Sequence, residues 1–435
     1  MIDLVELRRE PDAVKAALAR RGVSSATMDE ILALDLEHRR LLHEAEGLRA
    51  QVKELSRQVG EARRLKDAAT AEALSTQSRA LGDQERGASE KTDAVAAALR
   101  GLLLMIPNVP DPKVPDGLDD SDNVELRRWW VGMDEGSPLP TYADCQRVPH
   151  WEIGTELGIL DMESGAKLAG SMFALYRGAG SRLLRALGSF ALDRHAGDYE
   201  EIHPPSFALA ETMVSTGHLP KSVDDMYAIE RDGLWAIPTG EVPLTSLHRG
   251  EILDEAVLPV RLCAQTACFR REAGAAGRDT RGLLRVHEFD KVELFAYCTA
   301  AQADEAHADI LRRAEELLQA LGLTYRLLNL CTGDLGTASA YTIDLEVFSP
   351  GVDRWLEVSS VSWFRDFQAR RANVRYRRSD GSTALVHTVN GSALAWARIW
   401  AALVETYRQA DGSVALPGVL APYMGGETTI RPRPS

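Results

Sequence analysis

The sequence predicts an α+β protein, in which a long antiparallel helical hairpin precedes a larger domain of mixed strands and helices. Between about Met28 and Leu104, residues recur at alternating steps of four and three, the a/d spacing of an α-helical coiled coil. After Asn123, segments with period-two alternation are interspersed with amphipathic helical segments. Four prolines between Met105 and Leu118 stop any helix, so the two parts are expected to be joined by a stiff, extended linker.

The hairpin is predicted from two heptad seams. The first seam consists of Leu34, His38, Leu41, Ala45, Leu48, Val52, Leu55 and Val59. The second consists of Leu74, Ser78, Leu81, Glu85, Ala88, Thr92, Val95, Leu99 and Leu102. A polar stretch around Lys66 and Asp67 separates them, so we expect the two helices to fold back on each other. At about 1.5 Å per residue, helices of ~36 residues make an arm of roughly 54 Å.

The tip of this arm is basic. Its cations outnumber Glu54 and Glu61, and they are Lys53, Arg57, Arg63, Arg64 and Lys66. A dimerisation coiled coil would show the same heptad periodicity and stays open as an alternative. A long arm with a basic tip favours contact with an RNA.

The composition is ordinary for a soluble globular protein, with 435 residues, 45% hydrophobic and 26% charged. Nothing resembles a signal peptide or a membrane-spanning stretch, so we expect a cytoplasmic protein. Five scattered cysteines favour free thiols in a reducing compartment and no zinc site. Residues 1–105 hold 17 Lys and Arg against 18 Asp and Glu, so nearly all of the net charge of −14 lies C-terminal to them. Any RNA contact should therefore be local.

Residues 268–297 carry the densest set of chemically useful side chains. They are predicted to form a strand from Cys268 to Glu272 and a second strand from Leu284 to Tyr297, joined by a loop with Gly274, Gly277 and Gly282. Period-two alternation places five side chains of the second strand on one face: Arg285, His287, Phe289, Lys291 and Glu293. A surface hairpin with a solvated charged face would explain a single Arg-x-Glu, but hardly the whole block of 30 residues.

This block closely resembles motif 2 of class II aminoacyl-tRNA synthetases, in the form found in seryl-tRNA synthetases. Residues 180–205, an amphipathic helix and an extended segment ending at Pro205, are similar to motif 1, which builds the dimer interface in that class. Residues 236–253 resemble the family's serine-binding strip, and residues 345–371 resemble its metal-binding strand pair. Residues 387–403 resemble its motif 3, and we expect them to form a strand, a turn and then a helix.

The resemblance covers the whole chain and implies an antiparallel sheet flanked by helices, preceded by the coiled-coil arm. It divides the chain into a tRNA-binding domain at residues 1–105, a Pro-rich linker at 106–122, a catalytic domain at 123–426 and a loose tail at 427–435. It also implies a homodimer formed through motif 1, with the arm binding tRNA(Ser) across the dimer. No P-loop or Rossmann glycine signature precedes a helix.

The reaction implied is activation of L-serine by ATP with Mg²⁺, followed by transfer of the seryl group to the tRNA 3′ end. The residues implied for catalysis are Arg270, Glu272 and Arg398. Those implied for ATP are Arg270, Arg271, Glu272, Arg285, His287, Phe289, Glu357, Val358, Ser359, Ser360 and Arg398, with Glu357 and Ser360 holding the Mg²⁺. Those implied for serine are Thr239, Gly240, Glu241, Arg270, Glu293, Asn390 and Ser392.

Several residues depart from the family's usual pattern, and most are expected near the serine or adenylate pocket. They are Gly240, Tyr341, Val361, Trp363, Ala393, Trp396 and Ala421. These departures leave open a specialised duplicate synthetase, serving antibiotic resistance or natural-product biosynthesis. An amino acid:carrier-protein ligase would lack the arm, and a non-catalytic binding protein would have no need of Arg270 and Arg398.

Overall fold

The computed structural model describes residues 1–134, 137–273 and 280–432. The chain divides into two compact units, one of Ile2–Ile106 and one of Pro107–Ser435 together with Met1.

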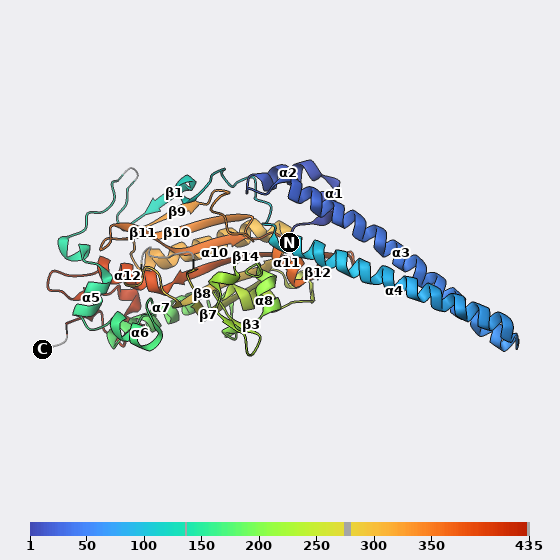
Figure 1. The fold of residues 1–435 in the computed structure, drawn as a ribbon. Coiled ribbons are helices and arrows are strands. Elements are labelled where there is room, and N and C mark those ends of the chain that lie inside the picture. The colour runs from blue at the N-terminus through green and yellow to red at the C-terminus, as the bar shows by residue number, and fades with distance from the viewer. Residues whose placement is uncertain (135–136, 274–279, 433–435) are drawn as a thin grey trace. The chain divides into compact units, whose positions relative to one another are not determined.

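The N-terminal unit contains two short helices, α1 (Leu4–Arg9) and α2 (Pro11–Ala19), and two long ones, α3 (Ser25–Arg64) and α4 (Ala68–Met105). Ser24 and Asp67 cap the long helices by accepting hydrogen bonds from the backbone N–H groups of Thr27 and Thr70. In Figure 1, α3 and α4 run side by side along their length. Every residue predicted for the two seams is buried or half-buried. The predicted hairpin is therefore confirmed, and the seam is filled by this chain's own helices, which leaves the dimerisation coiled coil without support.

The C-terminal unit is built on an eight-stranded sheet with the order β1-β9-β10-β11-β14-β8-β7-β2. Neighbouring strands are antiparallel except for β2, which is parallel to β7. The strands are β1 (Val124–Trp129), β2 (Glu200–Glu201), β7 (Val260–Phe269), β8 (Glu288–Cys298), β9 (Tyr325–Asn329), β10 (Tyr341–Ser349), β11 (Arg354–Trp363) and β14 (His387–Ala395). This confirms the predicted antiparallel sheet flanked by helices.

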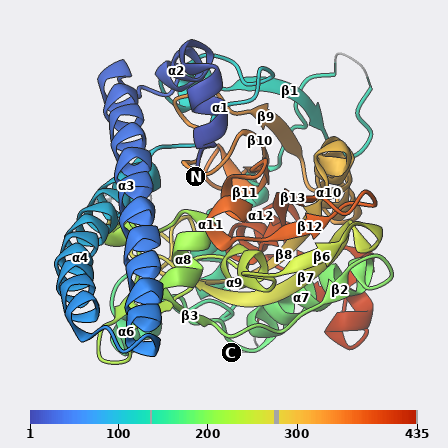
Figure 2. The ribbon, with the colours of Figure 1, turned by 90° about the vertical axis from the view of Figure 1, so that its right-hand side faces the viewer.

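The two faces of the sheet are covered differently. Three helices, α7 (Ala179–His195), α10 (Ala303–Ala320) and α12 (Trp396–Thr406), share one core with Val292, Leu294 and Ala296 of β8. The alternate residues Phe295 and Tyr297 pack into a second core with α9 (Glu241–Ser246) and α11 (Phe367–Ala372). Figure 2 shows α8 (Ala210–Thr216), α9 and α11 in one group beside the strands. Lys291 and Glu293 precede Phe295 on this second face, where the site lies.

Smaller elements complete the unit. Two helices, α5 (His150–Glu156) and α6 (Met162–Ala169), precede α7. The minor sheets contain β3 (Phe207–Leu209), β5 (Leu234–Ala236) and β4 (Ala228–Ile229); β13 (Thr383–Leu385), β12 (Arg375–Arg377) and β6 (Ile252–Asp254); and β15 (Val414–Ala415) with β16 (Thr429–Ile430). The 3₁₀ helices are η1 (Asp120–Asp122), η2 (Asp144–Arg147), η3 (Val223–Asp225), η4 (Glu255–Val257), η6 (Ala300–Gln302) and η7 (Gly418–Met424). No described helix has the length and apolar character needed to cross a membrane.

The strands of the motif 2 block are displaced from their predicted bounds. The first ends at Phe269 and the second begins at Glu288, four residues after the predicted start at Leu284. In the segment between the two strands, Glu272 and Gly282 adopt positive φ angles of 51° and 57°. The prediction that Gly282 permits an unusual backbone angle is confirmed, whereas Gly274 and Gly277 lie outside the described residues.

Two segments are more closely packed than expected. In the Pro-rich linker, Asn108 and Val114 are buried, and the backbone N–H groups of Asn108 and Asp111 donate to Thr337 and Ala340. The linker is therefore packed against the C-terminal unit instead of standing free of it. At the other end, Thr429–Ile430 pairs with β15 and Ile430 is buried, so regular structure extends past Gly426 into the segment expected to be loose.

Candidate active site

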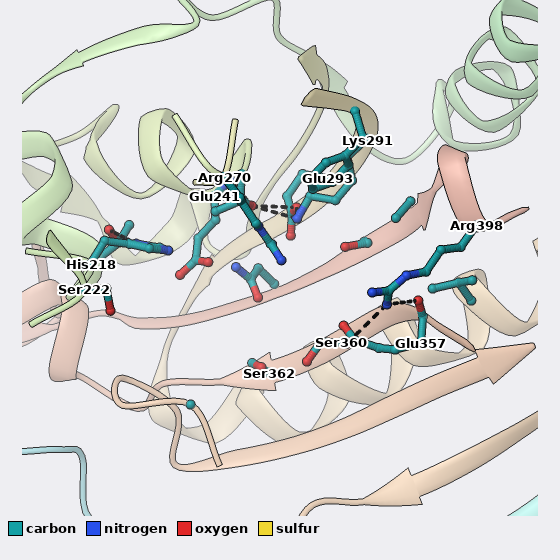
Figure 3. A pocket seen from close by; sticks show the side chains of 18 of the residues that line it. His218, Ser222, Glu241, Arg270, Lys291, Glu293, Glu357, Ser360, Ser362 and Arg398 are labelled. Carbon is teal, nitrogen blue, oxygen red and sulfur yellow. Dashed lines mark hydrogen bonds and ion pairs between the residues drawn. The ribbon is translucent and has the colours of Figure 1, made fainter. Parts of the chain in front are cut away.

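One pocket brings together the motif 2 block, the segment that holds Thr239 and Glu241, the β10–β11 pair and motif 3 (Figure 3). Thirteen of the predicted site residues line it: Thr239, Glu241, Arg270, Glu272, Arg285, Phe289, Glu293, Glu357, Val358, Ser360, Asn390, Ser392 and Arg398. They come from segments spread over more than 150 positions of the chain, so their convergence is a property of the fold.

Four predicted residues do not line the pocket. Arg271 is exposed, and its backbone N–H donates to Asp225 O. His287 turns back on its own segment, with Nδ1 2.9 Å from Arg270 O. Ser359 is buried and donates to Ser392 O at 2.7 Å. Gly240 lies behind the lining, where an added Cβ would stand 3.1 Å from Glu293 Cβ. The structure therefore gives these four no contact with the cavity.

Cations and an aromatic ring gather at the motif 2 end. The Arg270 guanidinium lies over the Phe289 ring at 5.2 Å, and its Nε donates to Pro238 O at 3.4 Å. Arg285 Nη1 pairs with Glu272 Oε2 at 2.8 Å. An ion pair and a ring contact therefore orient two guanidinium groups toward the cavity, where they offer paired N–H donors to phosphate oxygens.

Arg398 completes this wall from the first turn of α12, the position predicted for it. Its Nε donates to Leu284 O at 3.1 Å and its Nη1 to Glu357 O at 2.7 Å. Figure 3 shows the Arg398 side chain reaching toward Glu357 and Ser360. The predicted strand and helix of motif 3 follow one another directly, without the intervening turn.

Carboxylates gather at the other end of the pocket. Thr239 Oγ1 donates to Glu293 Oε2 at 3.1 Å and accepts from Lys291 Nζ at 2.8 Å. Lys291 also pairs with Glu293 at 2.5 Å, and both side chains are buried. Glu241 accepts from Gln368 Nε2 at 2.6 Å. Burial, reinforced by the Glu293 carboxylate, raises the pKa of Glu241 to about 7. A small cationic group placed here would relieve that repulsion and favour the ionised form of Glu241.

A β-bulge decides which side chains of β11 face the pocket. In the β10–β11 ladder Leu345 faces Ser359 and Glu346 faces Glu357, so Val358 is an extra residue on β11. Strict alternation would point Glu357 and Ser360 to opposite faces, because they are three residues apart. Because of the extra residue, the side chains of Glu357 and Ser360 both face the pocket. A second bulge, between Ser392 and Ala395 on β14, likewise lets both of those residues line the pocket.

Glu357 and Ser360 offer two hard oxygen donors to a cation. The described residues hold no group of three His, Cys, Asp or Glu that could bind a metal alone. Mg²⁺ prefers few protein oxygens together with phosphate oxygens and water, and the Glu357 side chain is 49% exposed, so this donor set fits it. Behind it, Asp344 Oδ1 is buried without a hydrogen-bond partner. Burial and the Glu357 carboxylate raise the pKa of Asp344 well above its usual range.

Sequence reasoning missed several lining residues. Lys291 could have been recognised, because it shares the predicted face of its strand with Phe289 and Glu293. His218, Ser222 and the segment from Gly336 to Ser339 carry no local signal, since loops bring them to the cavity. The His218 Nδ1 lies 2.8 Å from Thr216 Oγ1, and burial with the Arg270 charge lowers the pKa of His218 to about 3.

The departures from the family pattern do not line the pocket, although Gly240, Val361, Ala393 and Trp396 each adjoin a lining residue in the chain. None of them is among its described lining residues: Gly240, Tyr341, Val361, Trp363, Ala393, Trp396 and Ala421. Trp396 is fully buried in the main core. Trp363 Nε1 donates to His387 Nδ1 at 3.2 Å instead of pointing into the cavity. Gly240 abuts the carboxylate end, where an added Cβ would stand 3.1 Å from Glu293 Cβ.

The arm presents the cations predicted for its tip. Lys53, Arg57, Arg63, Arg64 and Lys66 are all exposed. Arg57 pairs with Glu54 at 2.7 Å and with Glu61 at 3.1 Å on its own helix. Its charge is thus offset locally. Arg63, Arg64 and Lys66 lie at the turn between α3 and α4, whereas Lys53 lies farther back along α3.

Comparison with known proteins agrees with this arrangement. Residues 1–110 match the seryl-tRNA synthetase N-terminal domain, and residues 227–407 match the class II tRNA synthetase core domain (G, H, P, S and T). The chain is 45% identical to the serine–tRNA ligase of Chloroflexus aurantiacus, over 99% of this chain and 100% of that one. The same identity relates it to the serine–tRNA ligase of Thermomicrobium roseum, over 100% and 96%.

Solved structures give the same answer. The seryl-tRNA synthetase of Pyrococcus horikoshii, solved with ATP, is 34% identical and superposes with a TM-score of 0.89 over 100% of both chains. The cytoplasmic serine–tRNA ligase of Naegleria fowleri, solved with AMP, is 27% identical with a TM-score of 0.82 over 98% and 96%. The chain belongs to the seryl-tRNA synthetases, a family of class II aminoacyl-tRNA synthetases.

Proposed function

We propose that the protein activates L-serine with ATP and transfers the seryl group to tRNA(Ser). The observation that carries this proposal is the polarity of the pocket. Arginines and an aromatic ring occupy one end, and two carboxylates with a threonine occupy the other. A nucleotide suits the first end, and a small ammonium compound with a hydroxyl group suits the second.

In the first step, a carboxylate oxygen of serine attacks the α-phosphorus of ATP, and the bond to pyrophosphate breaks. Arg270 binds the α-phosphate and the serine carboxylate. Phe289 and Arg398 cover the two faces of the adenine, and Glu272 accepts from its amino group. Thr239, Glu241 and Glu293 bind the ammonium group and the side chain of serine. No protein side chain acts as a nucleophile, because positioning and charge neutralisation supply the rate.

In the second step, a ribose hydroxyl of the tRNA 3′ end attacks the seryl carbonyl carbon, and AMP leaves. The basic arm binds the tRNA outside the pocket. Subunits pair through the motif 1 helix α7 in a homodimer. As the family resemblance implies, the arm of one subunit presents the tRNA to the active site of the other. The protein works in the cytoplasm, where tRNA and ATP are available.

A Mg²⁺ ion would be held by Glu357 and Ser360 on β11. When bound, it neutralises charge on the phosphates of ATP. The bulge at Val358, which turns both residues to the pocket, supports this assignment, as does Arg398, which donates to the Glu357 carbonyl.

Serine-dependent exchange of pyrophosphate into ATP tests the proposal. We expect exchange in the presence of L-serine and Mg²⁺. Exchange with another amino acid, and none with serine, would refute serine as the substrate. Arg270→Ala should abolish exchange while the protein stays folded. Arg271→Ala is the matched control, because Arg271 is adjacent in sequence but does not line the pocket. Equal losses in both variants would contradict the assignment of Arg270.

A further inference from the structure

A buried polar network lies behind the nucleotide wall of the pocket. Glu405 on α12 accepts hydrogen bonds from the backbone N–H groups of His150 and Gly351 at 2.9 and 3.0 Å, and from the Ser349 hydroxyl. It also accepts from His150 Nδ1 at 2.7 Å. The side chains of His150 and Glu405 are both 0% exposed. This carboxylate is therefore fully satisfied and holds the His150 ring in one orientation.

The far side of the ring receives a hydrogen bond from the motif 2 block. The backbone N–H of Leu283 donates to His150 Nε2 at 2.8 Å. Because a backbone N–H is only a donor, Nε2 must carry a lone pair. The hydrogen-bond network thus assigns a neutral imidazole whose proton sits on Nδ1 and points at Glu405.

The packing around this hydrogen bond is tight. A Cβ added at Gly282 would come within 2.4 Å of His150 Nε2 and 2.6 Å of Trp151 Cε3. Gly282 also has a positive φ of 57°. The glycine therefore lets the backbone approach the imidazole closely enough for the next amide to bind it.

The anchored amide belongs to a segment that forms the pocket wall. Leu283, Leu284 and Arg285 all line the cavity. The carbonyl of Leu284 accepts from Arg398 Nε, and Arg285 pairs with Glu272. Two residues of α12, Arg398 directly and Glu405 through His150, thus hold backbone groups of two consecutive residues of this wall, the carbonyl of Leu284 and the amide of Leu283.

We propose that His150, oriented by Glu405, is a positioning residue that fixes the Leu283 amide and thereby places Leu284 and Arg285 for ATP. The inference rests on the proposed function, since it concerns the nucleotide end of that site. The Leu283 backbone is buried, so loss of its acceptor would leave an unpaired N–H and shift the segment. The serine end, formed by Thr239 and Glu241, is held by other contacts and should be little affected.

Two substitutions separate this role from simple core packing. His150→Gln can keep an acceptor near the position of Nε2, whereas His150→Asn can keep only the donor toward Glu405. We expect His150→Asn to raise the KM for ATP about tenfold, the order of a lost buried hydrogen bond, with the KM for serine nearly unchanged. His150→Gln should stay within about twofold of the wild type for both substrates. His195→Asn is a control, because that ring is 2% exposed and lines a separate cavity. It should lower the melting temperature without changing the KM for ATP.

The positioning role is refuted if His150→Asn and His150→Gln raise the KM for ATP equally, or if the KM values for ATP and serine rise together. Hydrogen–deuterium exchange gives a readout independent of activity: the Leu283 amide should exchange faster in His150→Asn but not in His150→Gln. Should His150→Asn fail to fold, faster exchange in His150→Gln than in the wild type would still refute the role. Absence of serine-dependent exchange in the wild type would instead refute the proposed function.

Discussion

Glu241→Gln should raise the free energy of unfolding of the serine-free protein and, at the same time, destroy its serine site. Burial and the Glu293 carboxylate raise the pKa of Glu241 from 4.5 to about 7. A carboxyl group whose pKa is raised by folding favours the folded state below pH 4.5, and this contribution is lost as pH rises to about 7. At about 1.4 kcal/mol per pKa unit, the ionised group costs at most ~3.5 kcal/mol above pH 7. Glutamine carries no charge and so avoids this cost.

The assay is chemical unfolding of the wild type and Glu241→Gln at pH 8 and at pH 5, followed by a signal from the C-terminal unit. We expect the variant to have the higher free energy of unfolding at pH 8, by up to ~3.5 kcal/mol, and most of that advantage to disappear at pH 5. Serine should stabilise only the wild type. In the wild type, the KM for serine should be about tenfold higher at pH 6 than at pH 8, because binding requires the carboxylate. The role of the Glu241 charge is refuted if Glu241→Gln is less stable than the wild type at pH 8. It is also refuted if the difference in free energy of unfolding between the two proteins is the same at both pH values.

Three further outcomes are expected. Replacing residues 35–98 by a short flexible link should leave pyrophosphate exchange nearly intact and cripple aminoacylation, because the arm is a separate compact unit; unchanged charging of tRNA would contradict this. Neutralising Arg63 and Arg64 together should lower kcat/KM for tRNA about tenfold or more at low salt. Arg57→Gln should lower it less, because Arg57 is paired within its own helix, and equal losses would contradict this prediction. Gly240→Ala should raise the KM for serine several-fold, since the added methyl would press on Glu293 at 3.1 Å; an unchanged KM for serine would show that the pocket yields freely.

Much of the fold was predictable because its signals are local. The heptad seam of the arm depends on side chains three and four residues apart, and every predicted seam position is buried or half-buried in the hairpin. The motif 2 block was likewise recognisable as one continuous stretch. Within it, Arg285, Phe289, Lys291 and Glu293 share the pocket as period two requires.

Strict alternation of side chains did not predict which residues face the pocket where the strands are irregular. Glu357 and Ser360 reach the same cavity only through the bulge at Val358, which alternation along β11 alone would not indicate. His287 follows the expected spacing but lies before the strand begins, so its ring turns away to Arg270 O. The departures at Trp363 and Trp396 looked close to the site in sequence, yet both side chains are directed into other parts of the structure.

By itself the sequence determined the arm, the order of the motifs and the residue types that suit a nucleotide and an amino acid, because these depend on short-range spacing. Only the tertiary structure decided which of those residues meet. It placed Glu241 beside Glu293, which raises the pKa of Glu241, and it brought His150 and Glu405 together across 255 positions to support the Leu283 amide. Hydrogen bonds and charge repulsion act over a few ångströms in space, and separation along the chain does not measure that distance.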